Sequence, residues 1–417
     1  MPFAAPNIIL YTMNTVYFAK HILLESGEVL ANGAVSVCDG LIADVGPRGK
    51  VRRGGDERLV NLGDMLLLPG LINMHTHLEE SPIRSFRKEP EETFAAWSGK
   101  KNSQIRRLTD EQVRKGISLC TLEMISHGTT TVVDCTRSGI SASALANEPI
   151  RSAIFLEVAG ADFLKEGVDQ VRQWLGGGPA FRYGIGPHAF YSLTPREHRK
   201  LIEYSYDTGC LWACHAAESA EEVEAFCEQS GDFFRGVTRK KPWPAGNSRL
   251  GPLHYALAEG LIPSGAILFH CNYVTSNELA LLATKRAFVT ICPRYGAEME
   301  HKDFPVGLAS SRGIRICLGT EGMAPPGETS LFDELFRMKK ACPQINAVEM
   351  LRWVTKNPAA ALKASDKLGS ITPGKHADII GVRFPCAPNE DLLETLIMSD
   401  PNVAFVMIGG EEIIADC

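Results

Sequence analysis

The chain has 417 residues, of which 45% are hydrophobic and 22% charged. This balance is typical of a globular protein with a sizeable core, and it excludes disordered and fibrous classes. With 43 basic and 49 acidic residues the formal net charge is -6, so the surface has no general attraction for nucleic acid or anionic membranes, and neither is expected as a partner.

The sequence carries no signal for a membrane span or for export. No apolar run approaches the roughly 18 residues that a membrane helix needs, and residues 1–20 lack a basic lead followed by an apolar block. The 12 cysteines are scattered, with no C-x-x-C pair, whereas disulfide frameworks belong to short secreted chains. We therefore expect a cytoplasmic protein with reduced thiols.

Short β-type runs separated by glycine turns make up residues 1–65, for example Ile8–Thr12 and Leu41–Val45. Similar short runs, such as Val403–Ile408, return in residues 369–417. The two ends of the chain are predicted to form one sheet beside the central region.

Residues 66–368 alternate short apolar runs with helix-like segments. In Asp110–Ser126 and Pro195–Asp207 the apolar residues recur at helical spacing. Strand and helix alternate eight times over about 300 residues, which is typical of a (β/α)8 TIM-type barrel, with a doubly wound sheet as the alternative. The eight runs are Leu66–Met74, Thr129–Asp134, Ala153–Val158, Tyr183–His188, Leu211–His215, Ala266–His270, Ala287–Ile291 and Ile314–Thr320.

The segment Glu228–Leu250 contains three consecutive cations and two prolines around Trp243. It is predicted to be a long loop, either a solvated excursion or a lid over the substrate, because long loops on barrels often carry function.

Five of the 11 histidines stand at or just after the carboxyl end of a predicted strand. This is the end at which barrels perform their chemistry. The other six histidines have no such position, and most of them are expected on the surface or in packing. The five are His75, His77, His188, His215 and His270.

His75 and His77 form the most specific signal. Residues i and i+2 of a strand point to the same side, so both imidazoles are predicted to enter the barrel mouth and chelate one ion, with a structural pair as the alternative. His215, at the end of another strand, is the predicted third ligand. Imidazole ligands suit zinc, with iron as the alternative.

Acidic residues follow two of these strands. Glu218, three residues after His215, is predicted to shuttle protons, the alternative being an acid that favours a helix N-terminus. Glu321, at the end of the last strand, is predicted to ligate the metal and to take a proton from bound water, the alternative being a rim acid. His270 is predicted to be a ligand or a group that polarises water or substrate, and His188 to contact the substrate; core packing is the alternative for both.

With these residues in place, the chain resembles the amidohydrolase superfamily, in its branch of enzymes similar to cytosine deaminase and chlorohydrolases, over essentially its whole length. The resemblance implies a (β/α)8 barrel flanked by a small β-sandwich built from both chain ends, and one divalent metal ion. The matching segments are Pro69–His77, Gly128–Thr131, His215-x-x-Glu218, His270–Cys271, Gly319–Thr320 and Leu368–Asp378.

Within this branch, four segments look most like the aminodeoxyfutalosine deaminases of menaquinone biosynthesis: His75–Ser81, Phe94–Trp97, Cys292–Arg294, and His301 with Phe304-Pro305. That likeness implies that Glu79 holds the nucleoside, and that His188 and Arg294 face the substrate. A rim acid for Glu79 and a solvated cation for Arg294 are the alternatives.

Two departures from the family pattern bear on the site. Glu321 stands where the family has aspartate, and the extra methylene moves the carboxylate by about 1.5 Å when a ligand distance must hold within about 0.2 Å. Either the backbone compensates, or the group binds in another geometry, or the site is impaired. The Ser-Asn pair that usually follows strand seven is absent, and Tyr295-Gly296 stands there.

The resemblance implies a hydrolase of carbon–nitrogen bonds other than peptide bonds. We expect hydrolytic deamination of a purine-like nucleoside or base: metal-activated water attacks the amino-bearing ring carbon, Glu218 protonates the ring, His270 stabilises the developing charge and ammonia leaves. Dechlorination or another C–N hydrolysis of a triazine-like or cyclic amide substrate is one alternative, and a catalytically impaired binding protein is another. Branch members often pair through their helices, which makes a homodimer possible.

Overall fold

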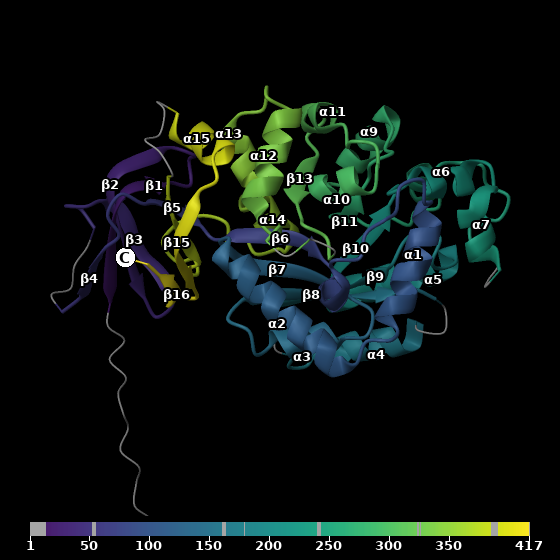
Figure 1. Cartoon of the computed structure of the whole chain (residues 1–417), viewed down its shortest axis with the longest axis horizontal. Helices are drawn as coiled ribbons and strands as arrows, with labels where there is room; N and C mark the ends of the chain where they lie inside the picture. Colours follow the sequence, from purple (N-terminus) through teal and green to yellow (C-terminus); the bar gives the residue numbers. More distant parts are fainter. Residues whose placement is uncertain are drawn as a thin grey trace, which may run out of the picture.

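Two eight-stranded sheets organise the residues that the structure describes. The computed structural model describes residues 14–51, 56–160, 164–178, 180–239, 243–322, 325, 327–384 and 391–416. In Figure 1 one sheet stands at the left, where its purple and yellow strands come from the two ends of the chain, and the other sheet forms a barrel.

The barrel strands are parallel and follow one another in chain order, which confirms the predicted (β/α)8 fold. All eight residues of β7 are buried, because helices cover the outside of a parallel barrel and side chains fill the inside. The strands are β6 (Leu71–Thr76), β7 (Thr129–Thr136), β8 (Arg151–Val158), β9 (Arg182–Pro187), β10 (Leu211–Ala216), β11 (Ile267–His270), β12 (Phe288–Ile291) and β13 (Arg315–Leu318).

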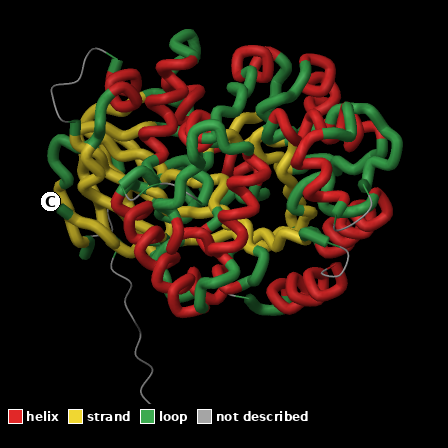
Figure 2. The backbone as a smooth tube through the Cα atoms, turned by 45° about the vertical axis from the view of Figure 1, so that its right-hand side comes forward, coloured by secondary structure: helices red, strands yellow, loops and turns green. Residues whose placement is uncertain are grey.

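Helices form the outer layer around these strands (Figure 2). Capping boxes fix where α2 and α5 begin, through Thr109 with Gln112 and Thr194 with Glu197. The helices are η1 (Leu78–Ile83), α1 (Phe94–Ile105), α2 (Asp110–Ser126), α3 (Ile140–Leu145), α4 (Leu164–Leu175), α5 (Pro195–Thr208), α6 (Ala220–Cys227), α7 (Gly231–Thr238), α8 (Pro252–Ala258), α9 (Ser276–Thr284), α10 (Pro293–Glu298), α11 (Val306–Ser311), α12 (Leu331–Ala341), α13 (Ala347–Arg352), α14 (Lys356–Ala361) and α15 (Leu392–Met398).

The barrel closes where the end of β13 meets β6. The backbone N–H of Thr320 donates to the carbonyl oxygen of His75 at 3.2 Å, and the Asn73 amide donates to the Thr320 hydroxyl at 2.7 Å. A Cβ on Gly319 would stand 2.6 Å from the Cβ of His75. Only glycine permits this approach, which brings β13 and the histidine-bearing strand together.

The terminal sheet confirms that both chain ends share one sheet. Its strand order is β16 (Glu411–Ala415), β15 (Asn402–Ile408), β14 (Ile379–Arg383), β5 (Leu66–Pro69), β1 (Thr15–Leu23), β2 (Val29–Cys38) and β3 (Leu41–Pro47), and β4 (Arg58–Asn61) pairs with β1. The predicted run Ile8–Thr12 lies outside the described residues.

The prediction of a single barrel strand over Leu66–Met74 is wrong. β5 pairs with β1 and β14 in the terminal sheet, and the chain passes into the barrel strand β6 at Gly70. Both strands are fully buried, so hydrophobicity alone does not separate them.

The segment Glu228–Leu250 is also more ordered than predicted, because it contains α7. Ser230 stands at the N-cap of this helix and Phe233 is buried beneath it. Trp243 packs on Phe226, with ring centroids 4.9 Å apart. Residues 240–242 lie outside the described part of the chain. Among the helices that the structure describes, none has the length and apolarity to cross a membrane.

Candidate active site

Three buried imidazoles meet at the carboxyl end of the barrel. His75 and His77 leave the end of β6, and His215 leaves β10. Nε2 of His215 lies 3.2 Å from Nε2 of His77 and 3.2 Å from Nε2 of His75. Two ligands on one tetrahedral zinc ion, each bound at 2.0–2.1 Å, stand about 3.3 Å apart. Both spacings from His215 are therefore those of ligands that share a cation.

Glu321 brings a carboxylate to the same point. Its Oε2 lies 2.8 Å from Nε2 of His75, and its Oε1 lies 3.5 Å from Nε2 of His77. Nε2 of His270 is 3.9 Å from Oε2 of Glu321. Neither Nε2 of His270 nor Oε2 of Glu321 has a hydrogen-bond partner among the described residues, although buried polar atoms are normally paired. The residues present fit one divalent cation, and the glutamate reaches the imidazoles despite the family's aspartate at this position.

The charges around the imidazoles also suit a cation. Burial lowers the pKa of His75, His77 and His270 well below the usual value, which keeps them neutral as metal ligands must be. Burial also lowers the pKa of His215, but the carboxylates of Glu157 and its acidic neighbours outweigh it and raise the pKa to about 9.

Glu157, near the end of β8, is a site residue that sequence reasoning missed. Its carboxylate lies 3.2 Å from Nδ1 of His215 and 4.0 Å from Nδ1 of His77. Burial raises the pKa of the Glu157 carboxyl. The imidazoles of His188, His77 and His215 outweigh this effect and hold that pKa well below its usual range. Nδ1 of His215 also lies 2.8 Å from the carbonyl oxygen of His188, its hydrogen-bond partner, and acceptors on the far side of an imidazole orient that ring toward a metal. The available signal was an acid within an apolar strand, since buried acids are rare unless paired.

Glu218 stands beside the histidine cluster with two further partners, Tyr295 and His301. Its Oε1 accepts a hydrogen bond of 2.9 Å from the Tyr295 hydroxyl. Nε2 of His270 and Nε2 of His301 are each 3.9 Å from this oxygen. His301 was grouped with histidines expected mostly in packing or on the surface, yet its side chain is only 3% exposed and faces Glu218. Tyr295 occupies the position where the family's Ser-Asn pair is absent.

The three predicted substrate residues lie in different settings. The His188 ring stacks on that of His215, with centroids 4.9 Å apart, and remains partly exposed. Glu79 lies in η1, where its carboxylate accepts hydrogen bonds from the hydroxyls of Thr136 and Ser138. Arg294 is buried, and its guanidinium donates to the carbonyl oxygen of Thr320 at 2.7 Å. His188 and Glu79 are therefore accessible at the rim, whereas Arg294 lies behind the site.

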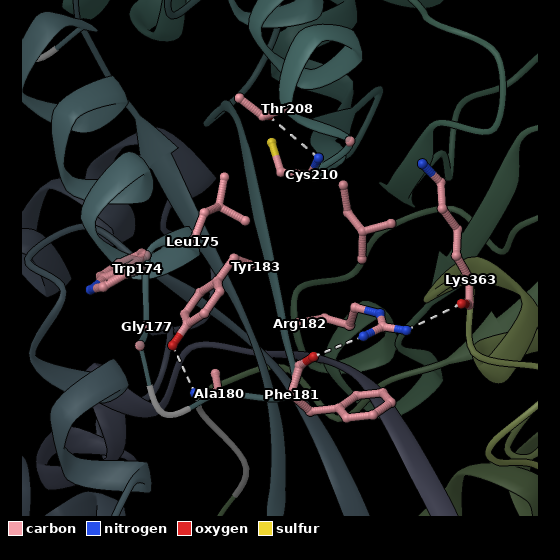
Figure 3. A pocket seen from close by; sticks show the side chains of 13 residues that line it. Trp174, Leu175, Gly177, Ala180, Phe181, Arg182, Tyr183, Thr208, Cys210 and Lys363 are labelled. Atoms are coloured by element: carbon pink, nitrogen blue, oxygen red, sulfur yellow. Dashed lines mark hydrogen bonds between the residues drawn. The ribbon is translucent and has the colours of Figure 1, made fainter.

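Two cavities differ in their relation to the site. One of about 320 Å³ borders it, because Arg137, Ser138 and Glu157 are among its lining residues. The other, of about 290 Å³, lies by the amino-terminal ends of β9 and β10 (Figure 3). Its lining includes Tyr183 and Cys210 and none of the predicted site residues. The first cavity therefore shares Glu157 with the histidine cluster.

Comparison with known proteins finds a family model and relatives that match most of the chain. The amidohydrolase family model matches residues 66–413. A 5-methylthioadenosine/S-adenosylhomocysteine deaminase of Pelotomaculum thermopropionicum is 27% identical over 94% of this chain and 93% of its own length.

Two solved structures share the fold. One is an adenosine deaminase from Xanthomonas campestris with bound zinc, with a TM-score of 0.83, 23% identity, and coverage of 97% of this chain and 93% of the other. The second is Helicobacter pylori aminofutalosine deaminase in complex with methylthio-coformycin, with a TM-score of 0.83, 21% identity, and coverage of 96% and 100%. At these identities the likeness establishes the barrel and its flanking sheet.

Proposed function

Since the chain belongs to the amidohydrolase family and is a hydrolase of carbon–nitrogen bonds, we propose that it hydrolytically deaminates the purine ring of a 5′-modified adenosine. The observation that carries this proposal is the position of His215 Nε2, 3.2 Å from Nε2 of His75 and of His77, beside the carboxylate of Glu321.

The substrate class follows from chemistry that the named relatives share. The relative from Pelotomaculum is named for 5-methylthioadenosine and S-adenosylhomocysteine, both of which carry an adenine on a ribose whose 5′ carbon is modified. Aminodeoxyfutalosine, indicated by the sequence motifs, belongs to the same class. The cavity beside Glu157 and Ser138 provides space for a group at the 5′ carbon.

In this proposal His75, His77, His215 and Glu321 hold one divalent ion, zinc being favoured by the nitrogen donors and iron being the alternative. When bound, such an ion lowers the pKa of water toward neutrality and stabilises negative charge. The Glu321 carboxylate accepts a proton from the attacking water. Its Oε2 lies 2.8 Å from Nε2 of His75, which places the carboxylate beside the proposed ion.

Glu218 and His270 act on the purine ring. Glu218 delivers a proton to the ring nitrogen, and the Tyr295 hydroxyl at 2.9 Å fixes the carboxylate that does so. His270, whose Nε2 lies between the carboxylates of Glu218 and Glu321 at 3.9 Å from each, stabilises charge as it develops. Burial of these groups strengthens each electrostatic contact.

The rim residues hold the nucleoside. Glu79 is fixed by Thr136 and Ser138 with its carboxylate near the cavity, and its acceptor oxygens suit the ribose hydroxyls. His188, stacked on His215, presents a partly exposed ring beside the reacting position. The contacts of Glu321 with His75 and His77 favour a working site over an impaired one.

The proposal is tested with zinc-loaded protein on a panel of compounds, by ammonia release from the aminated nucleosides, chloride release from the triazine and ring opening of the cyclic amide. The panel contains 5′-methylthioadenosine, S-adenosylhomocysteine, aminodeoxyfutalosine, adenosine, a chlorinated triazine and a cyclic amide. We expect turnover of 5′-modified adenosines and little of the last two. Turnover of only the triazine or the cyclic amide, or of nothing while metal is bound, would overturn the proposal.

A further inference from the structure

Arg294 lies directly behind the backbone that carries Glu321. It is the second residue of α10, which follows β12, and is 2% exposed. Its Nη2 donates to the carbonyl oxygen of Thr320 at 2.7 Å. A buried guanidinium bound to a carbonyl next to a proposed ligand can act on that ligand through the chain.

One peptide unit, between Thr320 and Glu321, is held at both ends. Arg294 binds its carbonyl oxygen, and its N–H donates to the carbonyl oxygen of His75 at 3.0 Å. The Asn73 side chain also donates to the Thr320 hydroxyl at 2.7 Å and accepts from the Thr320 N–H at 3.2 Å. The plane of this peptide, and hence the position of the Glu321 Cα, is fixed by contacts from β6 on one side and from Arg294 on the other.

Glu321 needs such a constraint because its backbone is strained. Its φ is 59°, in the left-handed region that side-chain-bearing residues disfavour. A strained conformation persists only where its surroundings enforce it. The glutamate side chain has one more rotatable bond than the family's aspartate, so its carboxylate can take more positions. A ligand distance, however, must hold within about 0.2 Å.

Arg294 is itself fixed by two acids. Its backbone N–H donates to Oε2 of Glu334 at 2.9 Å, and that carboxylate is 1% exposed on α12. Its Nη1 lies 2.8 Å from Oε1 of Glu298 in the same helix. The Glu298 ion pair and the Thr320 carbonyl hold the guanidinium against protein groups, although its Nε has no hydrogen-bond partner among the described residues.

We propose that Arg294 is a positioning residue: it holds the Thr320–Glu321 peptide so that the Glu321 carboxylate reaches the metal-binding imidazoles, and it does not contact the substrate. This inference rests on the proposed function only in that Glu321 is taken as a ligand. It replaces the sequence-based expectation that Arg294 faces the substrate.

The test compares Arg294→Met with the intact protein by zinc affinity, measured in competition with a chelator, and by the visible spectrum of the cobalt-loaded form. We expect the zinc affinity to fall by about tenfold to 100-fold and the cobalt spectrum to change. With a nucleoside that is turned over, kcat is expected to fall by about the same factor while KM changes less than about twofold. Arg294→Lys, which retains a donor for the carbonyl, should recover part of both.

Two controls separate positioning from a general loss of structure. Arg151→Met removes another arginine ion pair, made with Asp378 at 2.9 Å at the opposite end of the barrel, and is expected to leave zinc affinity unchanged. In the Glu321→Gln background, Arg294→Met should change zinc affinity by less than about twofold, because the group it positions is already lost.

A rise in KM with unchanged zinc affinity would overturn the proposal in favour of substrate contact. The proposal would also be overturned if Arg294→Met lowered zinc affinity equally with and without the Glu321 carboxylate, or if Arg151→Met lowered it as much. Either result would indicate a general structural role. If Arg294→Met fails to fold, Arg294→Lys and Glu334→Gln carry the same comparison, with smaller expected losses. Zinc affinity is read without substrate, so failure of the deaminase proposal leaves this result interpretable.

Discussion

The two ends of the barrel differ in which residue types adopt the left-handed backbone conformation. At the carboxyl ends of strands, left-handed backbone occurs at residues with side chains: Ala217 after β10, His270 at the end of β11 and Glu321 after β13, with φ of 47°, 68° and 59°. At the amino ends, Gly209 before β10 and Gly313 before β13 take similar φ of 71° and 73°. Glycine adopts this region without strain, whereas other residues lose about 1–3 kcal/mol there.

The difference shows that stability is lowered at the carboxyl end of the barrel, where the proposed chemistry takes place. The strained carboxyl end also holds buried imidazoles and carboxylates, some with no hydrogen-bond partner among the described residues, such as Oε2 of Glu321. The amino end has paired charges, such as Arg151 with Asp378 at 2.9 Å. Arg286, before β12, is an exception with φ of 53°. Substitutions at the two ends should therefore affect different properties.

The largest expected effect is that of His215→Ala. It removes the nitrogen that lies 3.2 Å from both His75 and His77, so we expect bound metal to be lost and turnover to fall by at least about 10³-fold. Metal content by elemental analysis and the rate of ammonia release check this. His198→Ala removes a buried histidine of α5 and serves as the control, with metal retained. Equal metal content in all three proteins would contradict the ligand assignment.

Glu218→Gln separates proton transfer from metal binding. The amide keeps an oxygen that accepts from the Tyr295 hydroxyl but does not donate an acidic proton, so kcat should fall by about 10²–10⁴-fold with metal content unchanged. Glu278→Gln alters a buried capping glutamate at α9 and should change stability without changing kcat. A kcat for Glu218→Gln within about twofold of the intact enzyme would show that this carboxyl is not the proton donor.

Glu157→Gln tests the acid behind the imidazoles. Loss of its charge beside Nδ1 of His215 at 3.2 Å weakens the orientation of the ring, and zinc affinity should fall about tenfold to 100-fold. The measurement is competition with a chelator, with Glu166→Gln, which lines the same cavity, as the matched control. Unchanged affinity would limit Glu157 to shaping the cavity.

The smallest effect is expected at the amino end. In Gly313→Ala the added Cβ has no atom within 4 Å, so only the left-handed φ of 73° opposes the substitution. The free energy of unfolding should fall by about 1 kcal/mol, with kcat and metal content unchanged. Gly236→Ala in α7 is the control of opposite sign, since alanine favours a helix. Denaturant unfolding measures both, and a kcat loss in Gly313→Ala would show that the two ends are coupled.

Much of the fold and the centre of the site were predictable from the sequence. The carboxyl ends of the strands of a parallel barrel lie at one rim. The sequence therefore predicted a cluster of His75 and His77, at the end of one strand, with His215 at the end of another. Glu218 and Glu321 were proposed by the same reasoning, and the structure places Glu321 against His75 and His77 and Glu218 near His270.

The residues that were missed depend on distances that no local pattern encodes. Glu157 lies within an apolar strand, and its partner His215 is 58 positions away along the chain, as their numbers in the sequence show. Tyr295 and His301 reach Glu218 from α10 and the loop after it. The buried strand β5 has the hydrophobicity of a barrel strand, and only its pairing with β1 and β14 assigns it to the terminal sheet.

The most direct test of the central claim is X-ray anomalous scattering at the zinc edge from crystals of the protein grown with zinc. We predict one strong peak with Nε2 of His75, His77 and His215 at about 2.0–2.1 Å and a Glu321 oxygen at about 2.0–2.2 Å. A crystal with these four side chains ordered and no peak among them, or with a peak held by other residues alone, would contradict the account.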